Sequence, residues 1–347
     1  MIVKLNQPKV AVVSDIHIGA HQNSSQWHKV LLEWGEWFKK ECREKGLTDI
    51  IIPGDLFHER NEINVHTLHV ASKLLESWKE FNVIITIGNH DSYYRQRADV
   101  HSLEMLKHWD HVTVVDELYT DTYFGKKITF CPWATQDIDI PKCDIVFCHM
   151  EISGFYVTKN HVCEKGHDPI ALTDIAPLII SGHFHLKDER VFKNGIILYT
   201  GCAFELYWGD YNNTKGYYIL DIPTSTYTFY ENNISPKHKK VFLSQLKKEG
   251  LTDEIKQDIK NNWVKFLIDE KVSDDKLLVL VEKLRSLGPL DIKVEYIIDD
   301  KGFSTDGSFE SVGIDIVKSI EEYVESMEVE HKEEIINYIL DMYGKVT

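Results

Sequence analysis

Five clusters of polar residues follow apolar runs in the first two-thirds of the chain. Fifteen of the 17 histidines lie in this part, between His17 and His185. A mixed set of carboxylate, imidazole and amide ligands suits Mn²⁺, Fe²⁺ or Zn²⁺ better than Ca²⁺. We therefore expect these clusters to bind divalent cations. The clusters are Asp15 with His17, Asp55 with His58, Asn89 with His90 and Asp91, His149, and His183 with His185.

The spacing within the clusters indicates how cations would be shared. In an extended segment, residues two apart lie on the same side, so Asp15 and His17 are expected to share one cation. Gly54 lacks a Cβ and lets the backbone turn sharply before Asp55, whose two carboxylate oxygens could bridge two cations. Two cations about 3.5–4 Å apart can activate hydroxide and hold a phosphoryl oxygen. Turn chemistry explains any single cluster equally well, but five in sequence favour a two-metal centre.

The elements that must position these residues read as an α/β sheet. Segments Trp27–Cys42 and Val65–Phe81 carry apolar residues at helical spacing and separate the first three apolar runs. Strand–helix–strand alternation predicts parallel strands, and sites in such sheets gather at the carboxyl ends. Three later segments, Ile196–Thr200, Tyr217–Ile222 and Tyr227–Tyr230, predict strands that complete a β-sandwich flanked by helices. The five runs are Val10–Val13, Asp49–Ile52, Val83–Ile87, Asp144–Cys148 and Leu178–Ile180.

Composition limits the class of protein. Hydrophobic residues make up 43% of the 347 residues, which excludes a disordered or collagen-like chain. The net charge of −16 argues against a protein that coats DNA, although not against a local basic groove. The six cysteines form no C-x-x-C pair, so we expect a reduced protein of the cytoplasm. No run approaches the ~18 apolar residues of a membrane span, and we expect no membrane partner and no signal peptide.

Together the clusters resemble the calcineurin-like metallophosphoesterase superfamily. The matching motifs are Asp15-x-His17, Gly54-Asp55 with Arg60, Gly88-Asn89-His90-Asp91, His149 and Gly182-His183-x-His185. A closer resemblance is to the SbcD-type nuclease subunits of double-strand-break repair complexes. It rests on His58 and on the later motifs Tyr199-Thr200-Gly201, Lys215-Gly216 and Asp221. The length of the chain and its C-terminal tail resemble those of the T4-type phage members of this family. This resemblance implies a Mn²⁺-dependent DNA exonuclease or endonuclease in repair and recombination. It would hydrolyse phosphodiesters with two Mn²⁺, or Mg²⁺ or another divalent metal, in the host cytoplasm if phage-encoded.

The resemblance also assigns roles to single residues. Metal one would be held by Asp15, His17, Asp55 and His185, and metal two by Asp55, Asn89, His149 and His183. His90 would donate a proton to the leaving oxygen, with Asp91 fixing its ring. His58 and Arg60 would bind the substrate. Many relatives have glycine before the fourth-motif histidine, where this chain has Cys148, which we interpret as a packed small residue.

Three domains are expected: a nuclease domain over residues 1–230, a DNA-capping domain over 237–303, and a helical segment over 304–347. In the second, strands Val264–Ile268 and Ile292–Ile298 flank a helix over Asp274–Leu287. Its lysine-rich segment Lys237–Lys248 either contacts phosphates or is a solvated linker.

The acidic third domain carries two apolar helical stripes, Val312–Met327 and Ile335–Tyr343. By the resemblance it would bind an SMC-like ATPase, and its alternative is packing on the chain's own capping domain. Relatives also form homodimers through helices near the first two motifs, for which Trp27–Cys42 and Val65–Trp78 are the candidates here.

Two other functions remain in view. A small-substrate phosphomonoesterase or phosphodiesterase of the same superfamily would use the same ligands, but would not need His58, the capping domain or the terminal helices. A non-catalytic scaffold would have lost ligands, and none of the expected ligand positions is lost.

Overall fold

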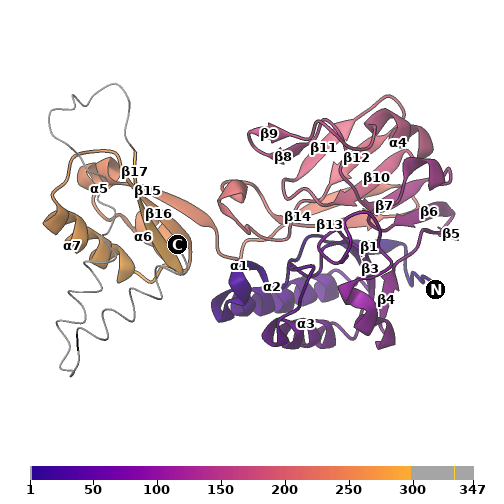
Figure 1. The fold of residues 1–347 in the computed structure, drawn as a ribbon, viewed down its shortest axis with the longest axis horizontal. Coiled ribbons are helices and arrows are strands. Elements are labelled where there is room, and N and C mark those ends of the chain that lie inside the picture. The colour runs from indigo at the N-terminus through magenta and orange to yellow at the C-terminus, as the bar shows by residue number, and fades with distance from the viewer. Residues whose placement is uncertain (1, 298–331, 333–347) are drawn as a thin grey trace. The chain divides into compact units, whose positions relative to one another are not determined.

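The computed structural model of the chain describes residues 2–297 and residue 332. Met1–Tyr296 forms one compact unit. Within it, two six-stranded sheets stack face to face, with helices on their outer sides (Figure 1). The two predicted tail helices lie outside the described residues.

The first sheet has the order β14-β13-β1-β2-β3-β4. Strands β1 to β4 run parallel to one another. At the other edge, β13 pairs antiparallel with β1, and β14 pairs antiparallel with β13. The apolar runs of the sequence are buried here, as expected for strands covered on both faces. The strands are β1 (Lys9–Val12), β2 (Asp49–Pro53), β3 (Asn82–Thr86), β4 (Val112–Val115), β13 (Gly216–Asp221) and β14 (Thr226–Glu231).

The second sheet has the order β11-β12-β10-β7-β6-β5. Strands β6, β7, β10 and β12 are parallel, and β5 and β11 pair antiparallel at the edges. The bounds are β5 (Tyr119–Tyr123), β6 (Lys126–Cys131), β7 (Ile145–His149), β10 (Leu178–Gly182), β11 (Asp188–Val191) and β12 (Ile196–Tyr199). Because parallel strands end at the same edge, the loops after β1, β2, β3, β7 and β10 can converge.

Helices cover the outer faces. The short helix α1 (Ala20–Asn23) precedes α2 (Ser25–Glu44), and α2 lies beside α3 (Val65–Ser77) on the first sheet (Figure 1). The Ser24 and Asn64 side chains cap α2 and α3 by accepting hydrogen bonds from backbone N–H groups. Helix α4 (Pro169–Ile175) packs on the second sheet. The remaining elements of this region are β8 (Tyr156–Thr158), β9 (His161–Val162) and the 3₁₀ turns Ser102–His108, Asp137–Asp139 and Trp208–Asp210.

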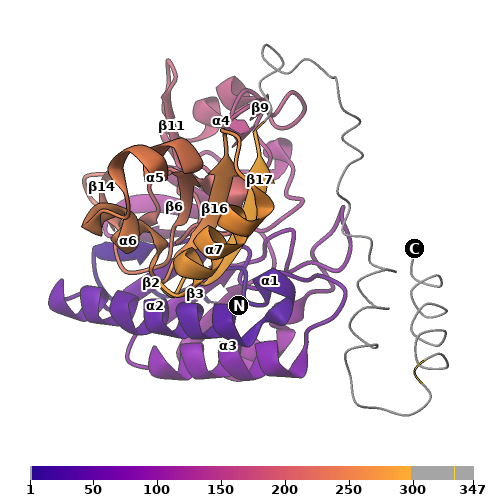
Figure 2. The same cartoon turned by 90° about the vertical axis from the view of Figure 1, so that its left-hand side faces the viewer.

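A third, smaller sheet follows residue 231. Strands β15 (His238–Phe242), β16 (Trp263–Ile268) and β17 (Asp291–Tyr296) are parallel. Helices α5 (Leu243–Glu249), α6 (Asp253–Ile259) and α7 (Asp274–Arg285) pack on it around a core of their own (Figure 2). The predicted strand, helix and strand correspond to β16, α7 and β17. The linker interpretation of Lys237–Lys248 is wrong, since this segment forms β15 and α5.

Two further properties bear on the expectations from composition. All six cysteine side chains are free thiols. Among the described residues, no helix combines the length and the hydropathy that a membrane span needs.

Candidate metal centre

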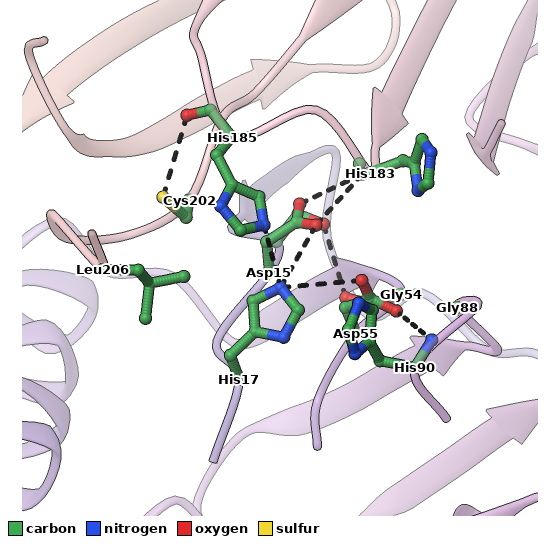
Figure 3. A network of polar contacts seen from close by, with 12 residues as sticks. Asp15, His17, Gly54, Asp55, Gly88, His90, His183, His185, Cys202 and Leu206 are labelled. Carbon is green, nitrogen blue, oxygen red and sulfur yellow. Dashed lines mark hydrogen bonds and ion pairs between the residues drawn. The ribbon is translucent and has the colours of Figure 1, made fainter. Parts of the chain in front are cut away.

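The loops that follow β1 and β2 are bound to one another where the polar clusters begin. The Asp15 N–H donates to the Gly54 carbonyl over 3.3 Å, and the His17 N–H donates to the Asp55 carbonyl over 3.1 Å. These backbone bonds extend the strand pairing beyond the sheet and hold the first two clusters side by side. Figure 3 shows the Asp15 carboxylate at the backbone N–H of His183 and the His17 ring facing that of His185; both histidines follow β10.

The ligand candidates have unusual backbone conformations. Asp15, His17, Asp55 and His183 all have positive φ, at 54°, 48°, 56° and 91°. Non-glycine residues rarely adopt this region, and such strain concentrates at functional sites. The expectation that Asp15 and His17 lie on an extended segment is therefore wrong. The strand ends at Val12, and left-handed turns direct the two side chains inward instead.

Close approach of the loops requires glycine at two positions. A Cβ on Gly54 would lie 2.2 Å from Nδ1 of His149, and one on Gly88 would lie 2.2 Å from Oδ1 of Asp55. Both distances are shorter than any real contact, so the glycines leave the space that the Asp55 and His149 side chains occupy.

One cluster of ligand atoms forms around His17. Its Nε2 lies 3.0 Å from Nε2 of His185, 4.0 Å from Oδ1 of Asp15 and 3.6 Å from Oδ2 of Asp55. These atoms face one another without an arginine or lysine ion pair to either carboxylate among the described residues. Figure 3 shows the arrangement.

A second cluster lies on the other side of Asp55. Nε2 of His149 is 2.8 Å from the Asn89 Oδ1 and 3.3 Å from the Asp55 Oδ2. Nδ1 of His183 is also 2.8 Å from the Asn89 Oδ1. Nδ1 of His149 lies 2.8 Å from the Pro53 carbonyl, which fixes the ring and leaves Nε2 as the ligand atom. Asp55 thus stands between the two clusters, and His183 and His185 belong to different ones.

The electrostatics suit divalent cations. Burial lowers the pKa of His17, and that of His185 to about 4, so both imidazoles are neutral and present a lone pair. Burial raises the pKa of Asp15 to about 7. It also opposes the charge on Asp55, but His149 and His17 hold the pKa of Asp55 well below its ordinary value.

The donor set fits a pair of metal ions. The buried Oδ2 of Asp55 has no hydrogen-bond partner, although it faces both clusters. Buried carboxylates are normally paired or coordinate metals. Each cluster also supplies imidazole nitrogens that could act as ligands. The residues would hold one cation on either side of Asp55, and their mixed oxygen and nitrogen donors suit a divalent transition metal.

His90 and Asp91, which are expected to act on the substrate, lie beside the two ligand clusters. Their hydrogen-bond partners differ from those expected. Nδ1 of His90 contacts the His58 carbonyl. The Asp91 carboxylate instead accepts backbone N–H groups of Leu56, Phe57 and Gly88 at 3.0–3.3 Å. Asp91 therefore fixes the loops, and the expectation that it fixes the His90 ring is not met.

His58 and Arg60 come from the loop after β2. The His58 ring is half-buried, with Nε2 3.0 Å from the Tyr207 hydroxyl and Nδ1 3.4 Å from Nδ1 of His17. Arg60 is also half-buried, and its Nη1 has no hydrogen-bond partner. Cys148 is a residue of β7 whose side chain packs in an apolar cluster, and burial raises the pKa of its thiol to about 12. That placement agrees with a packing role.

Sequence reasoning missed several neighbours of the centre. Oε1 of Glu151 lies 3.3 Å from Nε2 of His183, on the side of the ring away from Asn89. The Lys215 ammonium forms a buried 2.7 Å ion pair with Asp210 and also donates to the His185 carbonyl. The i, i+2 spacing of His149 and Glu151 was a usable signal for the first. Nothing in the local sequence indicates the ion pair.

Replacing Lys215 by methionine should destabilise the protein by about 3–5 kcal/mol, because it leaves the Asp210 charge buried without a partner. Both side chains are only 4% exposed. The matched control is Lys237→Met, since Lys237 and Glu231 are about 40% exposed and such pairs contribute under about 1 kcal/mol. Urea unfolding of both variants provides the measurement. Equal effects would show that the buried pair has no special role.

Comparison with known proteins adds to this geometry. The model of the calcineurin-like phosphoesterase family matches residues 8–187, more than half of the chain. Exonuclease subunit 1 of Enterobacteria phage T4 is 24% identical over 357 aligned positions, which cover 98% of this chain and 99% of the relative.

Two solved structures are weakly similar. An archaeal phosphodiesterase aligns with a TM-score of 0.37 at 14% identity, over 65% of this chain and 99% of its own. Vps29 of Entamoeba histolytica aligns with a TM-score of 0.32 at 14% identity, over the same shares. The relationship of this chain to known proteins therefore rests on the sequence matches.

Proposed function

The chain belongs to the calcineurin-like phosphoesterase family, and we propose that it is a DNA nuclease subunit that hydrolyses phosphodiester bonds together with an SMC-like ATPase. The observation that carries this proposal is the length of the match to the phage exonuclease subunit, 98% of the chain. The match continues beyond residue 231, where a small-substrate phosphoesterase needs no further domain. Repair and recombination of DNA ends are the processes in which we expect it to act.

We propose that two sets of residues, which share Asp55, bind the two cations. Asp15, His17, Asp55 and His185 would hold one cation, and Asp55, Asn89, His149 and His183 the other. When bound, two Mn²⁺ ions, or Mg²⁺ in their place, would supply Lewis acidity toward an attacking water and the phosphoryl oxygens. Asp55 keeps the two sites at a fixed separation because its carboxylate belongs to both.

His90 is the residue that we propose as proton donor to the leaving oxygen. Its ring is stacked at 5.4 Å on that of His58 and stands edge-on, 4.8 Å away, to that of His17. The contact of Nδ1 with the His58 carbonyl leaves Nε2 as the nitrogen available to substrate. To donate from Nε2, the ring must carry a proton on both nitrogens, so His90 would act as an imidazolium and become neutral in the step. His58 and Arg60 would bind the phosphate or the DNA end.

A comparison of substrates distinguishes a DNA nuclease from a small-substrate phosphoesterase. With Mn²⁺ present, the full chain should degrade linear duplex DNA and act poorly on p-nitrophenyl phosphate. The reverse order of rates would favour a small-substrate phosphoesterase of the same family. Digestion of end-labelled and circular DNA in parallel would separate exonuclease from endonuclease cutting.

The capping role of residues 237–303 is a further part of the proposal. The lysines of Lys237–Lys248 are less available to DNA than their number suggests. Lys239 pairs with Asp258 at 2.6 Å, and Lys247 pairs with Glu270 at 2.8 Å. Any phosphate contact by these lysines would therefore compete with their acidic partners.

We also propose a homodimer through the nuclease domain. The large apolar residues of α2 and α3, such as Trp34 and Leu74, are buried in the domain's own core. A dimer contact over these helices would therefore use their polar outer faces. Sedimentation at graded concentrations tests it, and a monomer at every concentration would remove this part of the proposal.

Truncation after Gly302 should leave a folded enzyme that still hydrolyses simple phosphodiesters, because every expected site residue precedes residue 186. It should lose co-purification with the ATPase, since the two apolar stripes of the tail need a surface to pack on. Isolated helices below about 12–15 residues are marginal, and exposed apolar surface usually marks an interface. Unchanged co-purification would contradict the docking role. A collapsed melting temperature would favour packing on the chain's own capping domain.

A further inference from the structure

A cavity of 790 Å³ opens directly beside the second ligand cluster. His149 and Glu151 border it on the side of the metal centre, and Arg95, Trp133 and Gln136 form other parts of its wall. Its volume is within the range of about 300–1,000 Å³ that is usual for small-molecule pockets. A phosphodiester held at the second cluster would therefore have room for one of its nucleosides in this cavity.

Trp133 gives the cavity a fixed aromatic surface. The indole ring is half-buried and lies 5.3 Å from the His183 ring and 6.1 Å from the His149 ring. Its N–H donates to the Arg95 carbonyl over 2.8 Å, and its backbone N–H donates to Ile87 over 2.8 Å. The indole N–H bond thus holds the ring, and the backbone bond holds the segment that carries it.

The cavity wall carries charges of both signs, with Arg95 and His167 as its basic side chains, and it can also accept an uncharged ring. Three carboxylates border it, and each already has a partner. Asp137 pairs with His167, Glu151 with His183, and Asp168 accepts the Ile170 N–H as the cap of α4. The amide of Gln136 is exposed at the rim, where it can donate or accept hydrogen bonds.

The other cavity at the centre lacks this surface. It measures 450 Å³ and is lined by Glu151, Glu164 and Phe184, among others. Phe184 is 4% exposed and stacks on Tyr199, so its ring face is not available to a ligand.

We propose that the cavity beside Trp133 binds the nucleobase next to the scissile phosphate, by stacking on the indole ring. This inference rests on the proposed nuclease function and adds a position for the unpaired base. A nucleotide of a single strand that enters the cavity loses stacking on its neighbour, and stacking on an aromatic side chain compensates for that loss. Stacking tolerates all four bases, so the subsite predicts nucleotide binding without a sequence preference.

The test removes the nucleobase of the substrate and the indole ring of Trp133 in separate experiments. Single-stranded oligonucleotides carry one abasic sugar at a defined position, and the rate of cleavage at each neighbouring bond is read from a sequencing gel with Mn²⁺ present. In the wild-type protein, the bond on one side of the abasic sugar should be cut about 5- to 100-fold more slowly than in the intact strand. Trp133→Ala should cut the intact strand at that reduced rate, and the abasic sugar should cause no further loss.

Three further variants complete the design. Trp133→Phe keeps an aromatic face and should restore most of the dependence on the base. Trp133→Leu replaces the alanine variant if that variant does not fold. It should cut the intact strand at the reduced rate, and the abasic sugar should cause no further loss. Trp109→Ala removes another half-buried indole, one that precedes β4 at the opposite end of the sheet, and should leave the abasic effect as in the wild type.

Each outcome decides between the two proposals. If the abasic sugar slows Trp133→Ala as much as the wild type, or does not slow the wild type at all, the subsite is refuted and the nuclease function stands. If the wild-type protein cuts no DNA but hydrolyses p-nitrophenyl esters, the nuclease function fails and the subsite fails with it.

Discussion

Replacing Asp55 by alanine should abolish activity and remove both metals, because a single carboxylate serves both ligand clusters. Its Oδ2 lies 3.6 Å from Nε2 of His17 in one cluster and 3.3 Å from Nε2 of His149 in the other. Without Asp55, the second site has no carboxylate left, and the first keeps only the buried Asp15 to balance a divalent charge. Elemental analysis of the purified variant after dialysis against Mn²⁺ provides the measurement, beside its hydrolysis rate.

Asp49→Asn is the matched control for this variant. Asp49 is also fully buried and begins the strand that Asp55 follows, but it binds Asn6, Thr48 and Asn82 at the opposite end. The control should keep both metals even if it is less stable. Two tightly bound metals per chain in Asp55→Ala would show that the bridging assignment is wrong.

Replacing His90 by alanine should keep both metals and lower the hydrolysis rate by about 10²–10⁴-fold, which is the usual contribution of a general acid. The backbone N–H of His90 donates to Oδ1 of Asp55 over 2.9 Å, and alanine preserves that bond. The loss should therefore arise from the missing imidazole, not from a displaced metal ligand. Rates and metal content are measured on the same preparation, with the exposed His108→Ala as control.

Two results would contradict this role. A rate near that of the wild type at neutral pH would remove His90 from the mechanism. Loss of one metal would instead make His90 a ligand, which its position beside His17 and His58 would allow.

The arrangement of the sheets was predictable because the strands are continuous apolar runs. A run such as Ile50–Ile52 can be buried on both faces only inside a layered sheet, and the polar residues that follow it must lie at the carboxyl edge. The convergence of Asp15, Asp55, His149 and His183 followed from that rule. The family assignment followed from the same residues and agrees with the match over residues 8–187.

The local geometry of the site was not predictable in the same way. Periodicity assumes a regular backbone, and the left-handed residues Asp15 and His17 depart from it at the positions that matter. Partners such as Glu151 for His183 and the His58 carbonyl for His90 depend on tertiary contacts between separate loops.

Anomalous diffraction at the manganese edge, from crystals grown with Mn²⁺, tests the central claim most directly. Two peaks are expected on opposite sides of the Asp55 carboxylate. One should lie among Asp15, His17 and His185, and the other among Asn89, His149 and His183. A single peak at this centre, or peaks confined to another acidic cluster such as His101, Glu104 and Asp116, would contradict a two-metal mechanism.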